Sequence, residues 1–158
     1  MAYNPGTSTA ITITAGSLGS GVARSSAAVT SGTTNNTAGI LLTVNALTTA
    51  TAASGNKQIV IYGYMSEDGT NYSGNSGTTD NVDGTDKTLT AVGSPTGLYR
   101  IGTIPLNQGA VAVTAHGEFE LTRIFGCVPR KWGIVLYNDA GIALGATFTA
   151  SYSEPYYT

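Results

Sequence analysis

The sequence has little charge and few residues suited to catalysis or metal binding. Its 158 residues include one cysteine, one histidine, seven Lys or Arg and nine Asp or Glu, so charged residues make up 10%, against roughly 25% in ordinary domains. A single cysteine excludes an intrachain disulfide, and one Cys with one His excludes a typical zinc site. Seven scattered basic residues and a net charge of −2 do not favour a nucleic-acid partner, which requires a cationic surface.

Long apolar segments are missing as well. The longest apolar runs, such as residues 59–62, are far too short to span a bilayer, and residues 1–6 lack the basic and apolar regions of a secretory leader. We therefore expect no membrane partner, and we expect synthesis and folding in a cytoplasm. No segment shows the period of a long amphipathic helix.

Threonine, serine, asparagine and 21 glycines are abundant, with Val, Ile and Tyr recurring between them. This composition favours short strands joined by turns. Alternation predicts its clearest strands at 40–47, 57–65, 131–137 and 143–152, with weaker ones that include 9–14, 22–29, 89–92, 98–104, 110–114 and 118–124. The fold class expected is all-β: one antiparallel β-sandwich or jelly roll over residues 1–158, with about eight short strands and an N-terminal arm over about 1–20.

Residues 67–86 differ from the rest of the chain. They hold five of the nine acidic residues and a single aliphatic one, Val82. We expect a long exposed loop here. Asp80, Asp83 and Asp86 offer oxygen ligands of the kind that calcium prefers, but their spacing is not that of an EF-hand. An acidic turn that keeps the surface soluble is the favoured interpretation, and no metal site is predicted.

Residues that could support catalysis are sparse. His116 and Cys127 fall on neighbouring predicted strands, but no motif surrounds either, so we expect a surface histidine and a small buried cysteine. Glu118 and Glu120 share one strand face at about 7 Å, a spacing that a glycosidase could use. A solvated face near Arg123 or a partner is favoured. The sequence predicts no enzyme, no catalytic residues and no cofactor.

Two groups of residues are candidates for an interface. Arg130 and Lys131 precede Trp132, which alternates with aliphatic residues as a core residue would. Arginine and aromatic side chains are enriched at protein interfaces. Near the end of the sequence, Tyr152, Tyr156 and Tyr157 would act as anchors for a neighbouring subunit.

Several segments resemble a family of small structural proteins from tailed bacteriophages, among them capsid decoration (cement) proteins. The segments are 17–21, 59–64, 66–69, 129–135 and 138–144. The resemblance implies a jelly-roll-like domain on the virion surface that self-associates, as a dimer or trimer, and docks on the major capsid protein. It carries over no site residues, and Cys127 stands where a small residue such as glycine is expected.

Two other functions are open. A tail, collar or fibre component of the same virion is one, although a fibre usually shows repeats or heptads and neither is present. The other is a carbohydrate-binding module, in which Tyr62, Tyr64, Tyr72 and Trp132 would stack on sugar rings. Only a flat row of exposed aromatic rings would support that second function.

Overall fold

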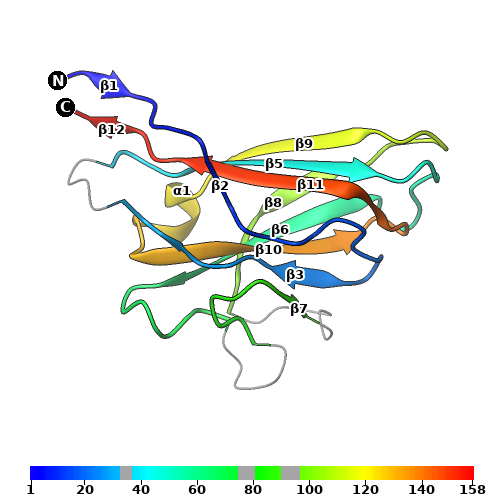
Figure 1. The fold of residues 1–158 in the computed structure, drawn as a ribbon, viewed down its shortest axis with the longest axis horizontal. Coiled ribbons are helices and arrows are strands. Elements are labelled where there is room, and N and C mark those ends of the chain that lie inside the picture. Colours follow the sequence, from blue (N-terminus) through cyan, green and yellow to red (C-terminus); the bar gives the residue numbers. More distant parts are fainter. Residues whose placement is uncertain (33–36, 75–80, 90–96) are drawn as a thin grey trace.

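The computed structural model describes residues 1–32, 37–74, 81–89 and 97–158, which form two antiparallel sheets stacked face to face (Figure 1). One sheet has four strands in the order β2 (Thr9–Ala10), β11 (Leu144–Ser153), β5 (Leu41–Thr48) and β9 (Thr114–Glu120). The other has the order β7 (Lys87–Leu89), β3 (Ala23–Ser25), β10 (Lys131–Asp139), β6 (Gln58–Ser66) and β8 (Tyr99–Pro105), and β4 (Val29–Thr30) also pairs with β10. A third, two-stranded sheet joins β1 (Tyr3–Asn4) to β12 (Tyr156–Tyr157). The predicted all-β sandwich is confirmed.

The main core lies between the two sheets and follows from strand alternation. In β5, Leu42, Val44 and Ala46 are buried on one face. In β10, Trp132 and Ile134 point toward the same core, and Trp132 is fully buried, as predicted. The Trp132 ring meets the Tyr152 ring edge to face, with centroids 5.1 Å apart, so β10 and β11 contact each other across the sandwich.

A second apolar cluster covers the outer face of the six-stranded sheet. It contains Tyr64, Val135, Leu89 and Val82, and the Tyr72 ring packs edge to face on Tyr64 with centroids 5.6 Å apart. Both faces of β6 are therefore buried, which explains its apolar residues on both faces. The predicted exposed loop at 67–86 needs correction, because Val82 is only 1% exposed. Its described acidic side chains lie at or near the surface, whereas Asp80 lies outside the described residues.

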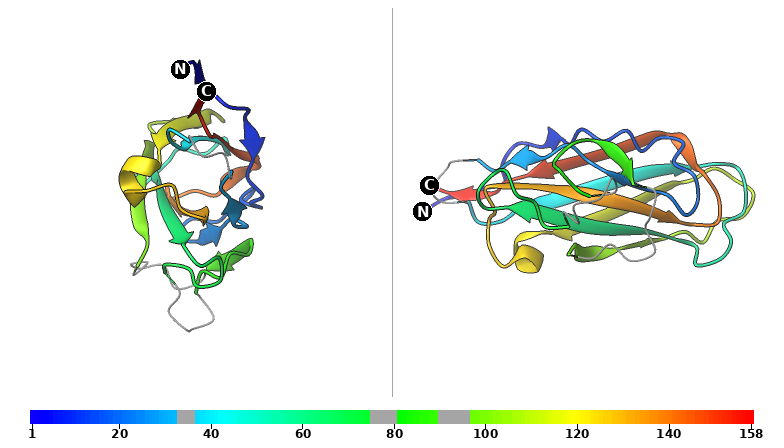
Figure 2. Two further views of the ribbon diagram at one scale, coloured as in Figure 1. Left: turned by 90° about the vertical axis from the view of Figure 1, so that its left-hand side faces the viewer. Right: turned by 90° about the horizontal axis from the view of Figure 1, so that it is seen from below.

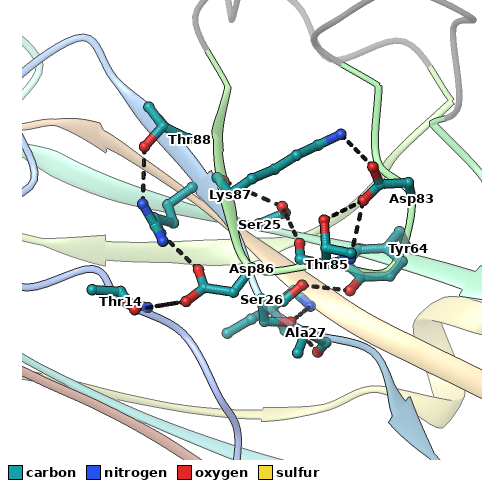
Figure 3. Close-up of polar contacts among 12 residues, drawn as sticks. Thr14, Ser25, Ser26, Ala27, Tyr64, Asp83, Thr85, Asp86, Lys87 and Thr88 are labelled. Atoms are coloured by element: carbon teal, nitrogen blue, oxygen red, sulfur yellow. Dashed lines mark hydrogen bonds and ion pairs between the residues drawn. The ribbon is translucent and has the colours of Figure 1, made fainter.

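Asp86 fixes the segment before β7 to the N-terminal part of the chain (Figure 3). Its carboxylate accepts a hydrogen bond from Arg24 Nε at 2.6 Å. It also accepts bonds from the Thr14 backbone N–H at 3.0 Å and the Thr14 hydroxyl at 2.6 Å. Partial burial opposes ionisation of Asp86, but these donors outweigh burial and lower its pKa. The ion pair therefore contributes to stability at neutral pH.

The variant Asp86→Asn is expected to lower the free energy of unfolding at pH 7 by about 1–2 kcal/mol, because a charge-assisted bond becomes a neutral one. The folded-state pKa of Asp86 lies below its unfolded value of about 4, so this stabilisation is present above about pH 4 and is lost as pH falls through the folded-state pKa. The urea midpoints of wild type and variant are to be measured at pH 7 and at pH 3. The difference between the two proteins should be smaller at pH 3 than at pH 7. An equal loss at both pH values would contradict this role, and the exposed control Glu67→Gln should change stability by less than about 0.5 kcal/mol.

The segment expected as an N-terminal arm over about 1–20 packs on the sandwich along part of its length. Thr9–Ala10, within the strand predicted at 9–14, pair with β11, and Ile11, Ala15 and Leu18 are buried in the main core. Residues 9–18 therefore belong to the sandwich, whereas Tyr3–Asn4 pair with β12.

The region after β8 contains one strand and a helical turn where two strands had been predicted, at 110–114 and 118–124. The observed strand is β9, and it is followed by α1 (Thr122–Phe125). Leu121 and Phe125 are buried four residues apart, a helical spacing, and Gly126 ends the turn with a φ of 78°. The predicted strands left residues 115–117 out, but these residues lie within β9. The strand predicted at 89–92 extends into residues 90–96, which lie outside the described part of the chain.

Candidate docking surface

Both chain ends form a ribbon that extends from one end of the sandwich (Figures 1 and 2). In this terminal ribbon, defined as residues 2–4 and 156–158, Tyr3 pairs with Tyr157 and Asn4 with Tyr156. The Tyr3 and Tyr157 rings meet edge to face with centroids 5.8 Å apart, and 56% and 43% of these residues is exposed. The Asn4 side chain donates to the Tyr156 hydroxyl at 2.8 Å. An isolated two-stranded ribbon is only marginally stable in water, so a partner that covered these rings would also stabilise the ribbon.

Large exposed apolar side chains gather at the two ends of the molecule. Those at the ribbon end, among the described residues, are Met1, Tyr3, Leu41 and Tyr157, and those at the opposite end are Val111 and Val113. Leu41 belongs to the ribbon end because it pairs with Ser153, three residues before β12. Clustered apolar exposure, unlike single exposed residues, marks interaction surfaces.

Arg130 and Lys131 lie at the same end as the terminal ribbon, at the start of β10 (Figure 1). Arg130 donates to the Asp68 carbonyl at 3.2 Å, and the Lys131 ammonium donates to the Gly69 carbonyl at 3.1 Å. Both cations thus hold the turn that follows β6. Backbone N–H groups of Asn71 and Thr70 donate to the Asp68 carboxylate and lower its pKa. Arg130 remains exposed and available to a partner.

Tyr152 does not belong to this surface. Its ring faces inward on Trp132, and burial, helped by the charge of Glu154, raises the pKa of its hydroxyl. The prediction that Tyr152 is an exposed anchor is therefore wrong, because its ring lies on the inner face of the sheet. The period-2 pattern explains why: Tyr152 pairs with the buried Leu42, so both side chains point into the core.

A hollow of about 450 Å³ opens near the ribbon end, on the outer face of the four-stranded sheet. It is lined by Leu41, Leu42, Thr43, Glu118, Phe119, Glu120 and Ser153. Sequence reasoning did not single out Leu41, because on the sequence it is one apolar residue of a strand with apolar residues on both faces.

The two carboxylates at this hollow are already engaged. Glu120 pairs with Arg123 at 3.2 Å and accepts from the Thr122 backbone N–H at 3.0 Å. Glu118 lies 3.4 Å from His116 Nε2. Their shared face and the pairing with Arg123 agree with the favoured interpretation of a solvated strand face.

The structure does not bring the other candidate catalytic pair together. His116 Nδ1 contacts the Asn45 side chain at 2.8 Å on the four-stranded sheet. Cys127 follows α1 and contacts Glu67 at 3.6 Å, and partial burial together with the Glu67 charge raises the thiol pKa. Cys127 is exposed, which corrects the expected buried position. Gly126 turns the chain outward there, a consequence of α1 that the strand prediction missed.

The aromatic residues considered for sugar stacking do not form a platform. Trp132 and Tyr64 are fully buried, and the Tyr64 hydroxyl donates to the Ser26 carbonyl at 2.7 Å. Burial raises the pKa of Tyr64. Two of the four rings therefore cannot contact a ligand.

Within the described ranges, no group of three or more His, Cys, Asp or Glu side chains is placed to hold a metal ion. The helices of the described chain include none with the length and apolar content to cross a membrane. No protein-family model, curated protein or solved structure matches this chain. Any function assigned to the protein therefore depends on its own residues and surfaces.

Proposed function

We propose that this chain is a structural protein of a tailed-phage virion, a decoration protein that binds the major capsid protein through its ribbon end and stabilises the head. The observation that carries this proposal is the gathering of exposed apolar and aromatic side chains at one end of the sandwich. Tyr3, Tyr157 and Leu41 all lie there. The resemblance of the sequence to phage decoration proteins supplies the class of partner.

The physical character of this end suits a permanent protein contact. Tyrosines contribute large contact areas at a low entropy cost. Arg130 adds an exposed guanidinium at the same end of the sandwich, and arginine is enriched where interfaces are strong. The chain carries only 10% charged residues, so a large contact would require few charges to lose their water.

The experiment is co-sedimentation of the purified protein with phage heads that lack their decoration protein. Saturable binding, at a stoichiometry that matches the symmetry of the head, and raised heat resistance of the particles are expected. The double variant Tyr3→Ser/Tyr157→Ser should bind at least about tenfold more weakly, since central aromatic contacts at interfaces contribute 2 kcal/mol or more.

Val111→Ser is the matched control, because Val111 is 67% exposed at the opposite end. It should bind as the wild type does. Equal loss in control and double variant would contradict docking through the ribbon end. Binding to tails instead of heads would make the protein a tail, collar or fibre component, and binding to glycans alone would overturn the structural function.

A further inference from the structure

Strand β9 has an open edge without a proline, a bulge or a short length to protect it. It spans seven residues at the margin of the four-stranded sheet and pairs with β5 on one side only. Natural proteins protect such edges with prolines, bulges, short strands, charged side chains or covering segments, and of these β9 has only the charges of Glu118 and Glu120. In β9 the pairing with β5 runs without a register shift from residue 114 to residue 120, and the strand contains no proline.

Other sheet margins in the described chain carry those protections. The margin strands β2 and β7 have two and three residues. β8 also has seven residues, but it ends at Pro105, and a bulge shifts its register opposite Ile61 and Tyr62. Its start is covered by α1, where the Tyr99 and Phe125 rings lie 5.4 Å apart. Among these margin strands, β9 is therefore the one whose free edge is best able to accept another strand.

We propose that β9 pairs antiparallel with β9 of a second copy, which joins two four-stranded sheets into one eight-stranded sheet across a two-fold axis. Antiparallel pairing of identical strands is symmetric by construction. The register that uses all seven residues places Gly117 opposite Gly117 of the second copy. The proposal specifies the self-association that the resemblance to phage decoration proteins implies, and it is independent of the proposed binding to the capsid.

Side-chain complementarity favours this register. It sets His116, which can donate a hydrogen bond to a carboxylate and is a cation when protonated, opposite Glu118 of the second copy, and Thr114 opposite Glu120 of the second copy. These outward side chains are accessible, since 53% of the His116 side chain and 73% of the Glu118 side chain is exposed. Opposite charges stabilise directly opposed residues on neighbouring strands, whereas like charges destabilise them. No carboxylate directly opposes another, so the two acidic residues of β9 do not prevent the pairing.

The packing around Gly117, which lies at the proposed two-fold axis, also favours the pairing. A Cβ on Gly117 would lie 2.8 Å from the Ile104 side chain and 2.9 Å from that of Phe119. The absence of a side chain lets β9 lie close to β8 of the opposite sheet. An edge whose register runs without a shift is the form that accepts another strand.

The test is light scattering coupled to size-exclusion chromatography over a range of protein concentrations, without capsids. The wild type should form a dimer that dissociates on dilution. His116→Glu would oppose carboxylates at the axis and should weaken the dimer by about tenfold or more. The double variant His116→Glu/Glu118→Lys restores opposite charges in the same register and should recover the dimer.

Glu67→Lys repeats the Glu-to-Lys change of that double variant at an exposed site after β6 and should leave the dimer intact. A wild type that stays monomeric at every concentration overturns the proposal, and so does a dimer that His116→Glu does not weaken. A trimer overturns it as well, because a two-fold strand pairing closes at two copies. These outcomes are obtained without a capsid, so they leave the proposed binding to the capsid protein untouched.

Discussion

Replacing Trp132 with alanine is expected to lower the free energy of unfolding by about 3–5 kcal/mol, the usual loss for a large core aromatic residue. Trp132 is fully buried and contacts Tyr152 across the two sheets, so the cavity would open where the layers meet. At this chain length each kcal/mol corresponds to roughly 2–4 °C, and the melting temperature should fall by about 10 °C. Urea denaturation followed by circular dichroism measures the loss.

The control for this variant is Trp132→Phe. The Trp132 indole N–H is buried without a hydrogen-bond partner, a state that costs free energy. Phenylalanine removes that N–H and keeps a ring for the edge-to-face contact with Tyr152. Its loss should stay below about 2 kcal/mol. If both variants lost the same amount, the ring contact between the sheets would not be the source of the stability.

Asn138→Ala should be the second most damaging change, at about 2–4 kcal/mol. The Asn138 side chain is fully buried. It donates to the Leu18 carbonyl at 2.9 Å and to the Ile142 carbonyl at 2.8 Å, and it accepts from the Ala140 N–H at 3.2 Å. Alanine leaves buried backbone groups of two separate turns without these partners. Chemical denaturation at neutral pH provides the measurement.

Asn56→Ala is a matched control in the same region of the fold. Asn56 is exposed and makes one bond, to Asp139 at 2.8 Å, so its loss should stay within about 0.5 kcal/mol. A comparable loss of unfolding free energy in both variants would show that the burial of Asn138 is not the reason for its contribution to stability. Asn138→Asp should be no better than alanine, since it removes both donors and places a carboxylate in the core.

The sequence predicted the central strands well because their apolar side chains recur at every second position. Trp132, Ile134 and Leu136 follow this period and are all buried, so the period of 2 located β10 and its inward face. The prediction failed between 114 and 118, where two separate strands were expected. Gly117 lies there within β9, and the Ile104 side chain occupies the space where its Cβ would be, a contact between distant residues that local reasoning cannot find.

The candidate surface was predicted in part. Tyr156 and Tyr157 lie in the terminal ribbon, and Arg130 and Lys131 lie at the same end of the sandwich. Tyr3 was missed, although the pairing of the chain ends makes it a neighbour of Tyr157, since no local pattern links residues so far apart. For the same reason residues 67–86 were taken for a free loop. A single valine, Val82, was not enough to predict the second apolar cluster. That cluster forms only because the segment folds back on Tyr64.

The strand pairings have a consequence for how the protein must be made. β1 pairs with β12, β2 with β11 and β3 with β10, so the beginning and end of the chain are matched in nested order. The strand partners of the first twenty residues lie more than a hundred residues further along the chain, so Ile11, Ala15 and Leu18 cannot be covered until β10 and β11 have been synthesised. Such long-range pairing slows folding.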